Sequence, residues 1–223
     1  MNALPTLGAV ASMGGVLTVI AGFWYWATPS FFEVGYEPIQ PGSGFSHKVH
    51  AGKLGIDCRY CHSNVEKSPE ANIPAVDTCY ACHGQGRVSP ARSTASDEKV
   101  QFIRDAYESD ESIEWRRVHK LPDYVRNFPH HVHVKAGVSC FSCHGQIMSM
   151  PVVRQEQSLS MSWCLDCHRH PEAAMVPQDK VTDLIWVQGE LQARGDGHGT
   201  VNTSDLRDRL WAAPPVACGA CHQ

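Results

Sequence analysis

The sequence has no excess of positive charge and no basic cluster. Its 223 residues include 19 Lys and Arg against 23 Asp and Glu, which gives a formal net charge of −4. Nucleic acids are bound mainly through clustered Lys and Arg side chains that neutralise phosphates. The composition therefore argues against a nucleic-acid partner.

Charge of either sign is missing from the first 32 residues, because Glu33 is the first charged side chain. Residues 7–27 form one apolar run, which spans roughly 30 Å as a helix, the thickness of a bilayer core. Aromatic residues end this run, from Phe23 to Trp26, and Pro29 follows them. We expect residues 1–32 to form one transmembrane helix with an interfacial aromatic belt, ended by Pro29.

Two other interpretations of this apolar run fit less well. A buried core helix needs protein on all sides, and a cleaved signal peptide has basic residues first, a shorter apolar stretch and a small-residue cleavage site. No Cys precedes Cys58, which excludes a lipid-attached N-terminal Cys. An uncleaved anchor is therefore favoured.

No cysteine lies outside one pattern, Cys-x-x-Cys-His, which occurs five times. This is the c-type haem attachment motif, in which two thiols bond to the porphyrin and the adjoining His binds the iron. The ten predicted haem-binding cysteines are Cys58, Cys61, Cys79, Cys82, Cys140, Cys143, Cys164, Cys167, Cys218 and Cys221. The five predicted proximal iron ligands are His62, His83, His144, His168 and His222. The sequence thus predicts five covalently bound haem c groups.

Structural zinc is the strongest competing interpretation, because paired Cys-x-x-Cys motifs at the spacing of Cys61 and Cys79 are typical of zinc ribbons. Zinc does not require a His after each second Cys, yet all five pairs have one. An odd number of pairs would also leave one without a partner. Disulfides and a redox dithiol fail for the same reason.

An internal repeat precedes two of the motifs. Residues 45–50 and 128–133 both read Phe-x-His-x-x-His, and each is followed by two haem motifs. We therefore divide a haem domain at 33–223 into block one, about 45–84, block two, about 128–171, and a final motif at 218–222. Helices are expected within 96–115, with a cap at Ser96, and within 181–191. About 38 residues per motif are too few to enclose each porphyrin separately, so the haems must form the core. The predicted fold is mainly α with extensive coil and little sheet.

Five irons need five distal ligands, and eight His lie outside the motifs. The repeat Phe-x-His-x-x-His is similar to a segment of class III multihaem cytochromes, in which the two His serve different haems. The predicted distal ligands are His47, His50, His119, His130 and His133. His131, His170 and His198 are expected to face solvent.

Methionine is the other available iron ligand. Met148, Met150 and Met161 lie in or near block two. We predict that Met150 ligates the haem of Cys164 and Cys167, with Met161 as the second choice, although Met is equally often a packing residue. A mixture of bis-His and His/Met irons would grade the haem potentials.

The chain closely resembles the pentahaem cytochrome subunit of bacterial alternative complex III, a quinol-oxidising membrane complex. The resemblance rests on the N-terminal anchor and on the segments at 45–62, 71–74, 118–125 and 163–169. Similar motifs occur in multihaem subunits beside molybdopterin enzymes.

This resemblance implies partners: an iron–sulfur or molybdopterin-like subunit, polytopic quinol-binding subunits, a monohaem cytochrome, and a soluble carrier or oxidase as acceptor. It implies an electron-transfer subunit and not an enzyme by itself, because an iron with two protein ligands has no open site. The alternatives are a membrane-anchored multihaem quinol dehydrogenase feeding a periplasmic reductase, and a multihaem oxyanion reductase. Haem c is attached after export, so we expect a single-pass inner-membrane protein with its haem domain on the periplasmic side.

Overall fold

The computed structural model describes residues 3–32, 34–87, 97–121, 125, 128–210 and 212–222. All of its regular elements are helices, joined by long coil segments. These ranges contain no strand and one isolated antiparallel bridge between Val138 and Met175. The predicted fold class, mainly α with extensive coil and little sheet, is confirmed. The helices are α1 Leu4–Phe32, η1 Lys48–Lys53, α2 Cys58–Cys61, α3 Val76–His83, α4 Asp97–Glu108, α5 His130–Lys135, α6 Cys140–His144, η2 Ile147–Ser149, α7 Met161–Arg169, η3 Pro171–Ala173, η4 Gln178–Lys180, α8 Leu184–Gly195, α9 Thr203–Asp208 and η5 Cys218–Ala220.

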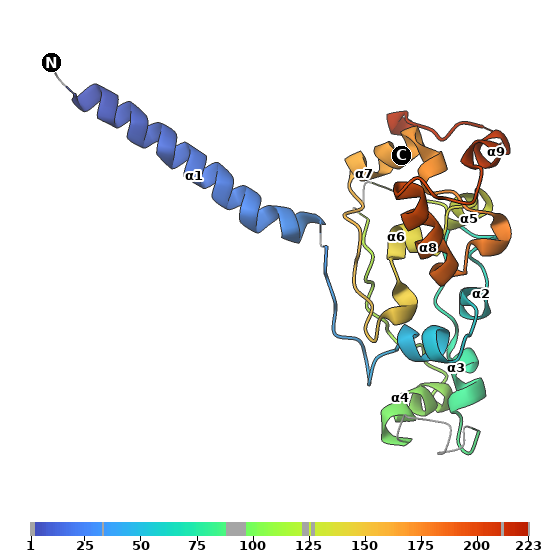
Figure 1. Cartoon of the computed structure of the whole chain (residues 1–223). Coiled ribbons are helices and arrows are strands. Elements are labelled where there is room, and N and C mark those ends of the chain that lie inside the picture. Colours follow the sequence, from blue (N-terminus) through green and yellow to red (C-terminus); the bar gives the residue numbers. More distant parts are fainter. Residues whose placement is uncertain are drawn as a thin grey trace.

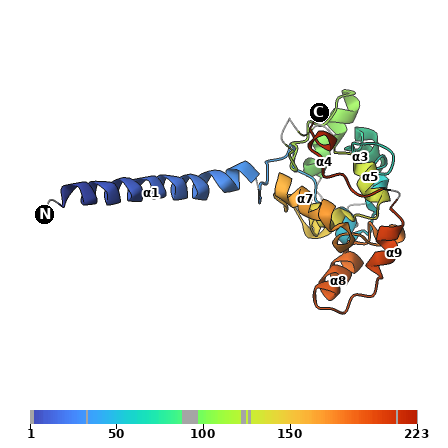
Figure 2. The same cartoon turned by 90° about the horizontal axis from the view of Figure 1, so that it is seen from above.

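Helix α1 stands apart from the other helices in both views (Figures 1 and 2). Its stretch Leu4–Phe23 has a mean hydropathy of 1.7 and no buried residue, so by length and composition it is a candidate membrane span. Leu7, Val10 and Met13 are each at least 60% exposed. A helix that is apolar all round and uncovered by protein is suited to lipid.

The end of α1 differs from the prediction. The helix continues to Phe32, three residues beyond Pro29, so Pro29 does not end it. A proline removes one backbone N–H from the hydrogen-bond ladder, and that loss can be tolerated near a helix end. The side chains of the expected aromatic belt at Trp24, Tyr25 and Trp26 lie outside the described part, whereas Phe23 is exposed.

Both expected helices in the domain are present. Helix α4 begins at Asp97 and ends at Glu108, seven residues before the end of the predicted range at Trp115. The predicted cap Ser96 lies outside the described residues. Helix α8 lies three residues later than predicted, because the Asp183 side chain accepts from the Trp186 N–H and caps it there.

The apolar protein core is small. It is a cluster of five buried valines drawn from block one, block two and the segment up to α8: Val65, Val134, Val176, Val181 and Val187. These valines come from distant parts of the sequence, so the cluster holds the two blocks and α8 together. At η1 and η2 the backbones pack closely, since a side chain at Gly52 would collide with the Met148 carbonyl.

The two repeat segments share one arrangement of rings, although the first leads into the π-helix η1 and the second into the α-helix α5. Phe45 stacks on His50 at 4.3 Å and meets His47 edge-on at 4.8 Å. In the second segment the rings of Phe128 and His133 stack at 4.6 Å, and His130 meets the Phe128 edge at 5.0 Å. The phenyl ring thus fixes the orientation of both histidines in each repeat.

Candidate haem-binding sites

Each Cys-x-x-Cys-His motif lies on or directly beside a short helix, α2, α3, α6, α7 or η5. Three-residue spacing puts both cysteines of a motif on one helix face. Side-chain caps begin three of these helices: Asp57 accepts from the Arg59 N–H, Ser139 from Phe141 and Ser160 from Trp163. All ten cysteines are free thiols, so no disulfide competes with haem attachment.

Five of the predicted iron-ligating histidines each make the same kind of hydrogen bond. Each has its ring Nδ1 beside a backbone carbonyl oxygen, which requires Nδ1 to carry the proton and leaves Nε2 bare in the neutral ring. Iron-binding histidines are commonly oriented in this way. The five are His62 with Asn72 at 2.6 Å, His168 with Pro215 at 2.6 Å, His130 with Pro69 at 2.8 Å, His50 with Ser46 at 2.9 Å and His133 with Pro129 at 2.9 Å.

Two pairs of histidine rings have a spacing that suits a metal ion between them. Ring centres of His50 and His83 are 5.9 Å apart, and those of His133 and His168 are 6.1 Å apart. Metal–imidazole bonds are about 2 Å long, so two rings on opposite sides of one ion have centres roughly 6 Å apart. Each pair combines a motif His with a His of the adjacent repeat segment.

A third group of histidines surrounds the first and third motifs. Its centre is His144, whose pKa is held well below the usual value by burial and then by His119, His130, His62 and His47. Burial also lowers the pKa of His47 and of His119 to about 4. These rings are therefore neutral near pH 7, as iron ligation requires.

His119 and His144 are closer together than the other two pairs. Their ring centres are 4.1 Å apart, and Nδ1 of His144 is 3.2 Å from either ring nitrogen of His119. That spacing is too short for a metal ion between the rings, so the two side chains would have to separate to share one. His47 also lies in this group, and its Nδ1 is buried without a hydrogen-bond partner.

The pKa shifts of several thiols have a thiol of another motif among their causes, which indicates which motifs are neighbours. The Cys58 pKa is lowered, chiefly by a hydrogen bond with Cys140. A hydrogen bond with Cys58, followed by burial, raises the pKa of Cys140 well above its usual value. The Cys61 pKa is raised by burial and then by Cys58 and Cys82. Burial raises the pKa of Cys143 to about 12, with Cys167 and Cys164 adding to it.

The fourth and fifth motifs are neighbours as well. Burial and then Cys221 raise the pKa of Cys164, and His168 hydrogen-bonds to Pro215, three residues before Cys218. The motifs therefore lie in the order second, first, third, fourth and fifth. Figure 1 agrees, with α3 at the lower end of the domain, α2 and α6 above it, and α7 and the C-terminus at the upper end.

A cavity of about 2050 Å³ lies along block two and the C-terminal motif. It is larger than the usual small-molecule site. The predicted haem-binding residues that line it include Cys143, Cys164, Cys167, Cys221, His133, His168 and His222. The free thiols, the bare Nε2 atoms, the ring spacings and this cavity all fit covalently attached haem.

The methionines occupy different surroundings. Met150 is 2% exposed, and its carbonyl accepts the Lys48 N–H, so it packs beside η1 as well as lining the cavity. Met148 is half-buried beside Gly52, whereas Met161 is 67% exposed at the start of α7. No geometry here tests iron ligation by Met150, which stays a prediction.

His170 and His198 are exposed, as predicted. His131 is not: it is half-buried, lines the cavity, and its Nδ1 is buried without a partner. The carbonyl acceptors of Asn72, Pro69 and Pro215 were also not foreseen. Asn72 has φ +56°, a conformation that Asn tolerates better than most residues, which is the one local signal for its acceptor role.

Comparison with known proteins agrees with these sites. Residues 43–100 match the family model for cytochrome c7 and related cytochrome c, which covers block one and its two motifs. Together with the five motifs, this match supports a multihaem c-type cytochrome, a class of electron carrier with covalently bound haem c.

One relative extends over nearly the whole chain. The chain has 26% identity over 221 residues to the multihaem cytochrome c subunit of menaquinone reductase from Nitratidesulfovibrio vulgaris Hildenborough. The alignment covers 95% of this chain and 88% of that protein. The similarity therefore extends into the apolar N-terminal helix and over most of the rest of the chain.

Proposed function

We propose that this chain is the electron-transfer subunit of a quinol-oxidising membrane complex, such as alternative complex III, and that it relays electrons through five haem c groups. The observation that carries the proposal is the continuous row of five neighbouring motifs. When bound, the haems supply one-electron chemistry. The protein supplies attachment, orientation and the axial ligands.

The ring spacings support an assignment of distal ligands. His50 would face the iron held by His83, since these rings are 5.9 Å apart. His133 would take the place of the predicted Met150 at the iron held by His168, since these rings are 6.1 Å apart. The irons of His62 and His144 would draw their distal ligands from His47, His119 and His130. Bonds from Nδ1 to backbone carbonyls hold His50, His130 and His133 ready for this role.

The order of the motifs supports a relay with two defined ends. The second motif, on α3, and the fifth, on η5, would be the points at which electrons enter and leave, because each has one neighbouring motif in the row. Cys82 and Cys218 are exposed, so both ends are accessible to a partner.

The apolar α1 supports a single-pass inner-membrane anchor with residues 33–223 on the periplasmic side, where haem c is attached. The partners would be an iron–sulfur or molybdopterin-like subunit, polytopic quinol-binding subunits and a monohaem cytochrome, with a soluble carrier or oxidase downstream. The resemblance at 45–62 and 163–169 supports this set.

A second function is favoured by the relative's name. A subunit of a quinone reductase would carry electrons towards menaquinone, and a membrane-anchored multihaem quinol dehydrogenase feeding a periplasmic reductase would react with quinol directly. Both use the same haem row in a different setting.

Two measurements test the proposal. Pyridine haemochrome analysis of the purified chain should give five haems that resist extraction by acid acetone; four or fewer would remove at least one site from the relay.

Mixing the isolated chain with menaquinol should leave the haems oxidised, whereas the haems of the same chain in the intact complex should become reduced. Rapid reduction of the isolated chain would instead support the quinol dehydrogenase.

A further inference from the structure

A groove of about 730 Å³ lies beside the second haem motif. It is bounded by the start of α3, the end of α4 and residues 110–115. Figure 1 shows α3 and α4 together at the lower end of the domain, away from α7 and α9. The groove is separate from the large cavity of block two, because no described residue lines both.

The groove carries negative charge that is not neutralised within the described part of the chain. Four exposed carboxylates line it, and none forms an ion pair with a described residue: Asp77, Asp110, Glu111 and Glu114. No Lys or Arg from the described ranges lines it. Two cations of this region are engaged elsewhere, since Arg104 donates to the His83 carbonyl and Arg87 lies over the Tyr80 ring.

This negative charge does not stabilise α4. The last turn of α4 contains Asp105 and Glu108 and no basic residue, and Asp110 and Glu111 follow directly. A helix C-terminus carries partial negative charge and is stabilised by cations, so carboxylates at this end are repelled by it. The charge is therefore unfavourable for the isolated helix and would be relieved by a positively charged partner.

Apolar and aromatic side chains lie among these carboxylates. Ile73 is 58% exposed and Tyr107 is 42% exposed, and Ile113 and Trp115 line the groove with them. Exposed aliphatic and aromatic side chains within a charged rim are typical of surfaces that bind another protein. The groove thus has both the apolar centre and the polar rim of an interface.

An aromatic stack connects the groove to the second motif. Tyr80 lies between Cys79 and Cys82, and its ring stacks on that of Tyr107 at 3.6 Å with an interplanar angle of 6°. Tyr107 lines the groove, and Cys82 is exposed. A protein bound in the groove would therefore contact the ring that packs on the segment predicted to hold the second haem.

We propose that this groove is the docking site of a small soluble cytochrome whose haem edge is surrounded by Lys side chains. The proposal rests on the proposed relay, since it takes the second haem as the point at which electrons leave. One electron passes from this haem to the docked carrier. The iron of this chain is thereby oxidised from Fe²⁺ to Fe³⁺ and the carrier iron is reduced from Fe³⁺ to Fe²⁺, without proton transfer.

The charge of the groove favours a transient partner over a permanent subunit. Permanent interfaces are more apolar and depleted in charged residues, whereas transient electron-transfer complexes use complementary charge for rapid association. Four unpaired carboxylates also repel an anionic lipid surface. A basic soluble carrier is the occupant that fits this chemistry.

Binding of mitochondrial cytochrome c, a small basic single-haem protein, tests the proposal. The full-length chain in detergent should bind it at low ionic strength, with an affinity that falls steeply as salt is added, as measured by isothermal titration calorimetry. Changing Asp110→Asn, Glu111→Gln and Glu114→Gln together should weaken binding about tenfold, because each exposed charge pair contributes modestly. Asn tolerates the φ of +57° at position 110, so this groove variant should fold and keep its haems.

A matched control removes the same charge from exposed positions at α9 and the loop before it, through Asp196→Asn, Asp205→Asn and Asp208→Asn. It should change the affinity by less than about twofold. Succinylated cytochrome c, in which the Lys side chains have become negatively charged, should not bind the wild-type chain. Undiminished binding in the groove variant, equal weakening in the control, or binding of the succinylated protein overturns the proposal.

The intact complex separates this proposal from the relay itself. Binding by the isolated chain but not by the complex would mean that another subunit covers the groove, which overturns the docking site. If menaquinol reduces the haems of the complex although no cytochrome binds, the relay stands and only the docking site is rejected. Haems that menaquinol cannot reduce in the complex would reject the relay as well.

Discussion

At the scale of single residues, the decisive feature is the Nδ1 hydrogen bond of the histidines. In the first repeat segment, His50 donates from Nδ1 to the Ser46 carbonyl, and the Phe45 ring stacks on the His50 ring. The His50 ring therefore cannot rotate freely, and its centre lies 5.9 Å from that of His83. These neighbours would hold His50 in place for its predicted role as an iron ligand.

Replacing His50 by Ala tests this arrangement. We expect about one fifth of the haem absorbance to become high-spin, because one of five irons loses its distal ligand. His198→Ala is the control, since His198 is exposed and outside every motif, and its spectrum should match the wild type. An unchanged low-spin spectrum in His50→Ala would assign that iron to another donor.

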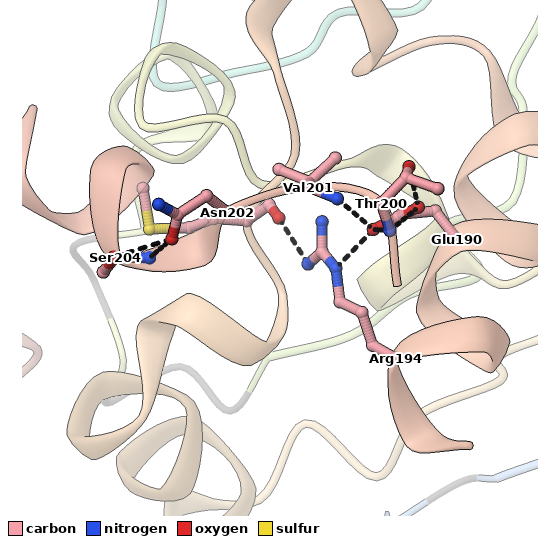
Figure 3. Close-up of polar contacts among 7 residues, drawn as sticks. Glu190, Arg194, Thr200, Val201, Asn202 and Ser204 are labelled. Carbon is pink, nitrogen blue, oxygen red and sulfur yellow. Dashed lines mark hydrogen bonds and ion pairs between the residues drawn. The ribbon is translucent and has the colours of Figure 1, made fainter. Parts of the chain in front are cut away.

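A buried carboxylate organises the loop after α8. Glu190 accepts hydrogen bonds from the Thr200 N–H and hydroxyl and from the Val201 N–H, and it pairs with Arg194 at 2.9 Å (Figure 3). Arg194 also donates to the Met175 carbonyl. Burial alone would raise the pKa of Glu190, but these hydrogen bonds outweigh it and lower the pKa from 4.5 to about 2. The pair thereby ties the segment leading to the fifth motif onto α8.

Because the folded-state pKa of Glu190 is depressed, its contribution to stability should be complete above about pH 5 and should be lost as the pH falls towards 2. Glu190→Gln should lower the free energy of unfolding by about 2 kcal/mol at pH 7 and by much less near pH 2. Denaturant unfolding followed by circular dichroism at several pH values measures this difference. Glu108→Gln, at an exposed position on α4, should change it by less than about 0.5 kcal/mol. A pH-independent deficit in Glu190→Gln would contradict the mechanism.

At the scale of elements, the motif helices are too short to be stable by themselves. They are held by their caps and by contacts to distant segments. The Ser139 hydroxyl accepts from the Phe141 N–H at the start of α6 and donates to the Val181 carbonyl at 2.7 Å. One buried hydroxyl therefore both begins α6 and joins it to the valine cluster.

Ser139→Ala should lower the free energy of unfolding by about 2 kcal/mol, because it removes a cap and leaves the buried Val181 carbonyl without its donor. Ser160→Ala removes only the cap of α7, whose first two residues are exposed, and should cost about 1 kcal/mol or less. Thermal and denaturant unfolding of the two holoproteins gives the comparison. Equal losses would show that the Ser139 to Val181 bond adds nothing.

At the scale of the whole molecule, the protein has two separate apolar regions. Helix α1 exposes its apolar side chains and is suited to lipid, whereas the domain has a small cluster of five buried valines and a large cavity lined by residues of the third, fourth and fifth motifs. Haems bound at the motifs would supply much of the remaining apolar interior. This arrangement agrees with the prediction that about 38 residues per haem cannot build a separate core for each.

Removing residues 1–32 and supplying a cleavable export signal should yield a cytochrome that is soluble without detergent and keeps its full haem content. The reason is that no side chain in Leu4–Phe23 is buried against the domain. Fractionation and haem quantification measure both properties, with the full-length chain as the membrane-bound control. A full-length protein that is soluble without detergent would contradict the anchor.

The sequence by itself determined the features that depend on covalent spacing. The five haem motifs, the apolar N-terminal helix and the repeated Phe-x-His-x-x-His segments are local patterns, and local helix geometry converts each into a definite arrangement of side chains. The sparse secondary structure follows from the ratio of residues to motifs. These inferences needed no knowledge of which segments pack together.

Tertiary structure decided the relations between distant segments. Whether His50 faces His83, whether the second motif ends the row, and whether the fourth and fifth motifs are neighbours all depend on contacts between residues far apart in sequence. His131 illustrates the limit, because its neighbours in the chain gave no sign that packing would bury its Nδ1. Such contacts arise from the joint packing of α2, α6, α7 and α8, and no local pattern encodes that packing.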